Sequence, residues 1–160
     1  MTDIAEARKI IECAYDGCES TISKITDYIY LTGLPGSLDY EKLESLGIQH
    51  IVSLGCGSIH RSRQCPITVS YIDIDDMPNV NISIYFDYIY QRTKGRVTLF
   101  HCAMGISRSA SMVIACLMND NGFNLADAII HVKMIRPWIQ PNSGFFKQLQ
   151  VYQMKNKNKR

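Results

Sequence analysis

The feature that most constrains this chain is a nine-residue stretch, His101 to Ser109, with the sequence HCAMGISRS. An apolar run typical of a buried strand, Val97 to Phe100, precedes it, and Ala110 to Met118, which favours a helix, follows it. A strand, a short loop and a helix in this order direct backbone N–H groups and the positive end of the helix dipole towards one point. Gly105 permits the tight turn that such a loop requires. The stretch therefore predicts an anion-binding loop.

Two side chains make this loop a candidate reaction centre. Cys102 lies at its start, where the field that holds an anion also stabilises a thiolate, so we expect a nucleophile at neutral pH. Arg108 offers a planar guanidinium group that matches two oxygens of a phosphate. Ser109 can donate its hydroxyl to the sulfur and make it a better leaving group. A buried cysteine or a solvated arginine is ordinary by itself, but their spacing around a glycine indicates phosphate-ester chemistry through a phosphocysteine.

The stretch has the form His-Cys-x-x-Gly-x-x-Arg-Ser and resembles the signature loop of cysteine-dependent protein phosphatases, specifically the compact dual-specificity group. The resemblance extends over residues 20–152, through Ile22 to Leu31, Arg136-Pro137, and the run from Ile139 to Leu149. It implies that Asn142 braces the loop and that the substrate phosphate is held by Ala103, Met104, Gly105, Ile106, Ser107 and Arg108. His101 is expected to orient the backbone of Cys102 through a ring hydrogen bond.

The departing alkoxide or phenoxide also needs an acid, which contributes about 10²–10⁴ in rate. Asp73, Asp75 and Asp76 lie in or just after a predicted strand, Thr68 to Ile74, at the edge where ligands bind in parallel sheets. The residues alone leave these three open. In the family that the loop resembles, the acid precedes a helix that begins near Ser-x-Tyr-Phe. Ser83 to Phe86 fits that pattern, so the resemblance implies Asp76, and Asp75 is expected to be a solvated carboxylate.

Strands alternate with helices along the chain, which predicts an α/β domain with a mostly parallel central sheet flanked by helices on both faces. We expect one domain over residues 1–160, with an amphipathic helix at 3–15 that packs on the core in preference to mediating a dimer. The basic residues 155–160 are expected to form a solvated tail. Further strands are predicted at 22–25, 28–31 and 50–54, and the first two are expected to pair in antiparallel fashion. Helices are predicted at 39–46, 82–91, 124–135 and 144–154. Asn124 is expected to cap the third of these helices and Ser143 the last. Residues 33–36 are predicted as a loop, and 59–64 as a solvated turn with a second phosphate contact as the alternative.

Composition and residue spacing limit the kinds of partner and cofactor that we expect. A net charge of +2 and a pI of about 8.2 do not argue for a nucleic-acid partner. The six cysteines form no C-x-x-C pair and the four histidines show no metal-ligand spacing, so we expect neither a metal nor a cofactor. Residues 1–9 are charged, unlike a signal peptide, and no apolar run approaches about 20 residues, so no membrane association is expected. A catalytic thiolate favours a reducing compartment, the cytoplasm or the nucleus. We expect a monomer or a weak homodimer.

The expected substrates are phosphorylated proteins, both phosphotyrosine and phosphoserine/phosphothreonine, because the chain is too short for the longer phosphotyrosine-recognition segment of classical tyrosine phosphatases. Four alternatives stay open. A phosphoinositide phosphatase usually carries lysines in the loop, and an RNA 5′-triphosphatase typically has Thr in place of Ser109 and a more basic surface. A glycan phosphatase would need a carbohydrate-binding domain. A phosphoprotein-binding module would lack the nucleophile that Cys102 provides.

Overall fold

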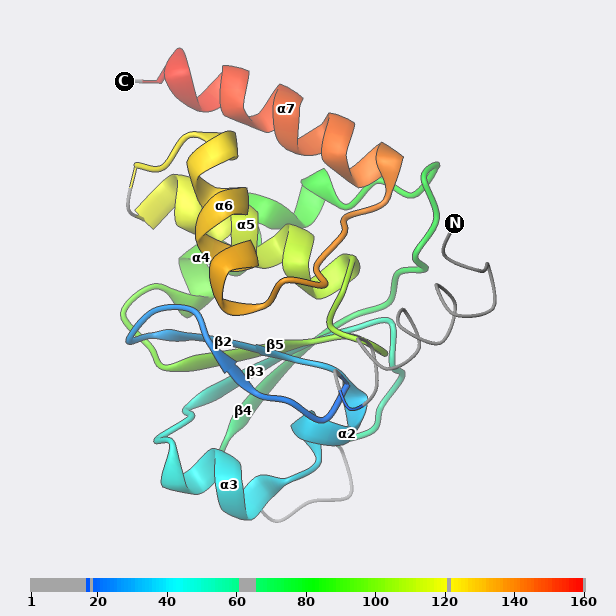
Figure 1. Cartoon of the computed structure of the whole chain (residues 1–160), viewed down its shortest axis with the longest axis vertical. Coiled ribbons are helices and arrows are strands. Elements are labelled where there is room, and N and C mark those ends of the chain that lie inside the picture. The colour runs from blue at the N-terminus through cyan, green and yellow to red at the C-terminus, as the bar shows by residue number, and fades with distance from the viewer. Residues whose placement is uncertain (1–16, 18, 61–65, 121, 160) are drawn as a thin grey trace, which may run out of the picture.

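The fold is a five-stranded sheet with helices on both of its faces (Figure 1). The computed structural model describes residues 17, 19–60, 66–120 and 122–159, so the helix predicted at 3–15 lies outside the described residues. The strands are β1 (Ser23–Lys24), β2 (Ile29–Thr32), β3 (His50–Leu54), β4 (Thr68–Ile72) and β5 (Thr98–His101), in the order β1-β2-β5-β3-β4. All neighbours pair in parallel except β1 and β2. The α/β fold and the antiparallel extension are therefore confirmed.

The helices divide between the two faces of the sheet. Figure 1 shows α3 (Tyr40–Ser45) on one face and, on the other, α4 (Phe86–Thr93), α5 (Arg108–Asp120), α6 (Leu125–Ile135) and α7 (Ser143–Lys157). Successive strand residues point to opposite faces, so Leu99 of β5 packs in a small cluster with Leu43 of α3, whereas Phe100 packs against the α5 side. None of the helices in the described part of the chain is both long and apolar enough to cross a bilayer.

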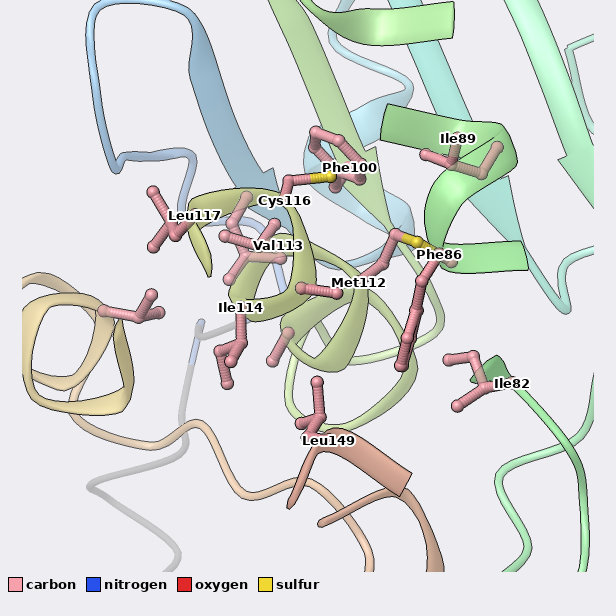
Figure 2. Packing of buried hydrophobic residues seen from close by; sticks show 14 of the residues in the cluster. Ile82, Phe86, Ile89, Phe100, Met112, Val113, Ile114, Cys116, Leu117 and Leu149 are labelled. Atoms are coloured by element: carbon pink, nitrogen blue, oxygen red, sulfur yellow. The ribbon is translucent and has the colours of Figure 1, made fainter. Parts of the chain in front are cut away.

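Helix α5 is the centre of the larger core. Every residue from Ser109 to Met118 is buried, so the helix is enclosed by other elements on all sides. Figure 2 shows its side chains between Phe100 of β5, Ile89 of α4 and Leu149 of α7. This packing fixes the helix directly behind the loop that joins it to β5, and so gives the predicted reaction centre a rigid support.

Several boundaries differ from the sequence prediction. The loop predicted at residues 33–36 is replaced by a single helical turn, α2 (Leu34–Ser37). This turn tolerates Pro35 because proline is compatible with the first turn of a helix. A short 3₁₀ helix, Ser83–Tyr85, precedes α4. The last helix, α7, extends to Lys157 and includes part of the predicted tail, since lysines are favourable at the negative end of a helix dipole. It is capped by Asn142 and not by Ser143.

The turn after β3 also differs from its prediction as a solvated segment. Residues 61–65 lie outside the described part of the chain, but His60 is 5% exposed. Its ring is buried because it packs against Tyr40 of α3 and His101 of β5.

Candidate active site

The predicted nucleophile lies at the carboxyl end of β5, in the centre of the sheet. Cys102 follows the last residue of the strand and is 2% exposed. Its Sγ lies 3.0 Å from Oγ of Ser109, which is fully buried in the first turn of α5. Residues that the sequence predicts to act together are therefore in hydrogen-bond contact, as sulfur departure assisted by Ser109 requires.

The loop from Cys102 to Arg108, the Cys102–Arg108 loop, has its carbonyl groups held from outside. The backbone N–H of Leu34 in α2 donates to the carbonyl of Ala103 at 2.9 Å, and that of Gln140 donates to Ile106 at 2.8 Å. The fold thus brings two segments that are distant in sequence onto the outer side of this loop.

Arg136 holds the next two carbonyls. Its Nη2 donates to Met104 at 3.1 Å and its Nε donates to Gly105 at 2.9 Å, while Nη1 donates to the carbonyl of Thr21. The side chain is fully buried, and its guanidinium carbon lies 5.0 Å from the centre of the Trp138 ring. Gly105 has φ of +67°, and a Cβ there would meet Arg136 Nη2 at 2.6 Å, so glycine is required for this close approach.

Hydrogen bonds from His101 and from α5 satisfy the two remaining carbonyls of the loop, those of Cys102 and Ser107. His101 Nδ1 lies 3.2 Å from the carbonyl of Cys102, as the expected orienting role requires, and Ser111 of α5 donates to Ser107 from its N–H and its hydroxyl. All six carbonyls from Cys102 to Ser107 are therefore occupied. In a trans peptide the N–H points opposite to the carbonyl, so the N–H groups of residues 103–108 face the inner side of the loop. Among the described residues none of these amides donates a hydrogen bond, which leaves them available for an anion.

Arg108 is braced beside these amides. Its Nη1 donates to the carbonyls of Gly55 and Ile74, at 3.2 and 3.3 Å. Strand β4 ends at Ile72, two residues earlier than predicted, because its partner β3 ends opposite it at Leu54. The carbonyl of Ile74 pairs with Arg108 and not with a neighbouring strand. The buried Nε of Arg108 has no partner among the described residues. A buried donor without a partner is costly, and a phosphate oxygen would satisfy it.

Asp76 is the aspartate that contacts the loop. Its Oδ1 accepts hydrogen bonds from the Ser107 hydroxyl at 2.7 Å and from Asn142 Nδ2 at 2.8 Å. The backbone N–H of Asn142 also donates to Ser107 Oγ, so Asn142 ties the acid candidate and the loop to the start of α7. Asp73 and Asp75 are exposed and make no such contact within the described residues. This geometry agrees with the assignment that the resemblance implied.

Electrostatics keeps the neighbouring histidine neutral. Burial lowers the pKa of His101 to about 4, and the positive charge of Arg108 acts in the same direction. At neutral pH the ring of His101 therefore carries one proton, and its contact with the Cys102 carbonyl assigns that proton to Nδ1.

Three residues of this arrangement were not assigned a role from the sequence. The sequence points to Arg136 only through the family resemblance, and the available signal is a basic residue next to Pro137 in an apolar stretch. The sequence predicts a solvated turn around His60 and a helix around Tyr40, with no role for Tyr40. No local pattern links His60 to His101, because the two meet only when β3 and β5 pair.

Comparison with known proteins agrees with this geometry. Residues 29–155 match the family model described as "Dual specificity phosphatase, catalytic domain". The chain belongs to the dual-specificity phosphatase family. It is 37% identical over 143 residues to human dual specificity protein phosphatase 13B, covering 81% of this chain and 71% of that protein. The crystal structure of DUSP15 superposes with a TM-score of 0.75 at 30% identity, covering 86% of this chain and 90% of that one.

Some members of the family are much longer than this chain. A probable rhodanese domain-containing dual specificity protein phosphatase from Dictyostelium discoideum is 35% identical over 134 residues, which are 81% of this chain but 28% of that protein. The match is therefore to the phosphatase catalytic domain, and the region outside that domain in the longer relative has no counterpart in this comparison.

Proposed function

We propose that this chain hydrolyses phosphotyrosine and phosphoserine/phosphothreonine in proteins, through a phosphocysteine intermediate. The observation that carries the proposal is a set of donors without partners among the described residues: the six amides on the inner side of the loop that begins with Cys102, and the buried Nε of Arg108. These donors match the equatorial oxygens of a phosphoryl group, and the thiolate is at the position of an attacking group.

In the first step the sulfur of Cys102 forms a bond to phosphorus while the bond from phosphorus to the leaving oxygen breaks. The loop amides and Arg108 hold the equatorial oxygens, and positioning with charge stabilisation supplies most of the catalysis in such loose transition states. Asp76 in its acid form gives its proton to the leaving oxygen. Because Oδ1 of Asp76 already accepts two hydrogen bonds, Oδ2 is the oxygen that carries the proton.

In the second step water attacks the phosphocysteine. The carboxylate of Asp76 removes a proton from the water, an oxygen–phosphorus bond forms, and the sulfur–phosphorus bond breaks to release inorganic phosphate. The Ser109 hydroxyl, 3.0 Å from the sulfur, donates to the departing thiolate and stabilises it. No metal or cofactor is needed to balance either step. The need for a free thiolate supports a proposed location in a reducing compartment, the cytoplasm or the nucleus.

The test is phosphate release from matched phosphotyrosine and phosphothreonine peptides, with a 5′-triphosphate RNA and a phosphoinositide beside them. Release from both peptides, and its loss in Cys102→Ser by at least about 10⁴-fold, is the expected result. Release confined to the RNA or the lipid would keep the chemistry and overturn the substrate class. Peptide binding without release from any substrate would favour a phosphoprotein-binding module.

A further inference from the structure

One carbonyl of the Cys102–Arg108 loop is held differently from the other five. Backbone N–H groups and arginine always carry the hydrogens that they donate, so five carbonyls have permanent donors. The carbonyl of Cys102 depends on Nδ1 of His101, which donates only when that nitrogen carries the proton. Something must therefore select this tautomer.

A buried chain of side chains behind the loop makes that selection. Nε2 of His101 lies 2.9 Å from Nε2 of His60, and Nδ1 of His60 lies 2.6 Å from the hydroxyl of Tyr40 in α3. The two imidazole rings are nearly perpendicular, at 85°, and their centres are 5.0 Å apart. The contacts run from α3, through the segment after β3, to the end of β5.

The donor and acceptor in each of these hydrogen bonds can be assigned by starting from the carbonyl of Cys102. A carbonyl oxygen only accepts, so Nδ1 of His101 donates to Cys102 and, in the neutral ring, Nε2 of His101 accepts. Nε2 of His60 must then donate, whether the His60 ring is neutral or charged. When His60 is neutral its Nδ1 accepts from the Tyr40 hydroxyl. Each bond fixes the position of the proton in the next ring.

We propose that His60 and Tyr40 are positioning residues, which hold His101 in the tautomer that keeps the Cys102 carbonyl turned away from the phosphate site. Without the donor on His60, the proton of His101 is free to move to Nε2. The lone pair of Nδ1 would then face the oxygen of Cys102 and repel it. The same peptide unit carries the N–H of Ala103, so its release would misdirect one of the six amides that face the phosphate and the thiolate.

This role rests on the proposed catalytic function of Cys102, but its first test needs no turnover. Nitrogen NMR of the histidine rings in the wild-type protein should show His101 protonated on Nδ1. His50 is an internal reference with the opposite tautomer: Arg96 donates to its Nδ1 at 2.9 Å, so its Nε2 donates to Ser70 Oγ. A proton on Nε2 of His101 in the wild type would overturn the proposal.

The second test compares two substitutions of His60. His60→Leu removes the donor, whereas His60→Gln retains an amide N–H with similar reach. We expect His60→Leu to lower kcat by about 10- to 100-fold, as small misplacements in active sites do. We also expect it to shift the pH–rate profile for iodoacetamide alkylation of Cys102, followed on the Cys102 peptide by mass spectrometry, to higher pH. His60→Gln should have a kcat and an alkylation profile close to those of the wild type.

His50→Leu is the matched control, because it also removes a buried histidine, but from the amino end of β3, whereas His60 lies in the segment that follows the carboxyl end. It should lower the thermal unfolding temperature without changing alkylation of Cys102. If His60→Leu folds and alkylates as the wild type does, or if His60→Gln is as impaired as His60→Leu, the proposal is wrong. Should His60→Leu not fold, Tyr40→Phe takes its place and is expected to shift the alkylation profile in the same direction. An unshifted profile in Tyr40→Phe would contradict the role of Tyr40.

Alkylation and NMR also separate this proposal from the proposed function. A protein that releases no phosphate from any substrate but shows the expected tautomer and alkylation shift would contradict the function alone. A protein that hydrolyses both peptides, with the alkylation of Cys102 unaffected by His60→Leu, would contradict the positioning role alone.

Discussion

The two ends of strand β3 each lie beside a buried histidine and an arginine, but only one end forms a candidate active site. At the amino end, Arg96 donates to His50 and to Thr68, and His50 contacts Ser70, so the polar groups of this cluster pair with each other. At the carboxyl end, the carbonyls of the Cys102–Arg108 loop are paired and its amides are not. Arg108 likewise has a paired Nη1 and an unpaired, buried Nε.

The difference shows how a binding site can be recognised without a bound ligand. Both clusters contain an arginine, a histidine and a serine, so these three residue types alone do not separate them. A buried donor without an acceptor has a free-energy cost of about 1–3 kcal/mol, and the Nε of Arg108 is such a donor. The Nε of Arg108, beside loop amides that donate no hydrogen bond among the described residues, therefore marks the carboxyl end of the sheet as the candidate ligand site.

The largest expected effect on catalysis comes from replacing the arginine at each end of β3 by lysine, one at a time. Arg108→Lys should lower kcat/KM by about 10³-fold, because lysine lacks the planar fork that binds two phosphate oxygens. Arg96→Lys should leave kcat/KM unchanged and lower the free energy of unfolding by about 1 kcal/mol, through the lost bond to His50. Peptide kinetics and urea unfolding of both variants check this. If both substitutions lowered kcat/KM equally, the carboxyl end of β3 could not be distinguished from the amino end as the active site.

A similar effect on turnover is expected from Asp76→Asn. The variant should bind inorganic phosphate as the wild type does, measured by competitive inhibition, but hydrolyse phosphoserine peptides about 10²–10⁴-fold more slowly, because an amide cannot protonate the leaving oxygen. An aryl phosphate with an acidic phenol needs less protonation and should be affected less. Asp75→Asn is the control and should retain activity. Near-normal turnover of phosphoserine peptides by Asp76→Asn would refute the assignment.

The smallest expected effect concerns stability and pH. Burial lowers the pKa of both His50 and His101 to about 4, whereas unfolded histidines protonate near 6.5. Between these values the unfolded state binds more protons, so stability is full above about pH 6.5 and falls as the pH drops to about 4. Each histidine contributes at most about 3 kcal/mol to this loss. His50→Leu should lose less stability than the wild type between pH 7 and pH 4.5 in urea unfolding. An equal loss would show that His50 is not buried in its neutral form.

Local signals in the sequence were sufficient for the strand, loop and helix around Cys102. An apolar run, a glycine and the Cys-x5-Arg spacing act over neighbouring residues, and the structure has β5, the loop and α5 in that order. Asn124 caps α6 as predicted, because a cap depends on the side chain and the N–H three residues later. The range of α7 was less predictable, since Asn142 and Ser143 are both good caps.

The choice of a candidate acid needed more than a local pattern. Asp73, Asp75 and Asp76 are equivalent in the sequence alone, and the family resemblance indicated Asp76. The structure distinguishes Asp76 through its contacts with Ser107 of the Cys102–Arg108 loop and with Asn142 at the start of α7. These contacts span 31 and 66 residues, so no sequence window contains them.

The sequence by itself determined the α/β fold and singled out the candidate nucleophile Cys102, with Arg108 and Ser109, because each follows from short-range periodicity or from spacing within one loop. Only the tertiary structure decided how that loop is held. Arg136, Leu34 and Gln140 reach its carbonyls from other segments, and His60 reaches His101 across paired strands. Carbonyls are alike in every residue, so which donor satisfies each one depends on the packing of distant segments and leaves no mark in the local sequence.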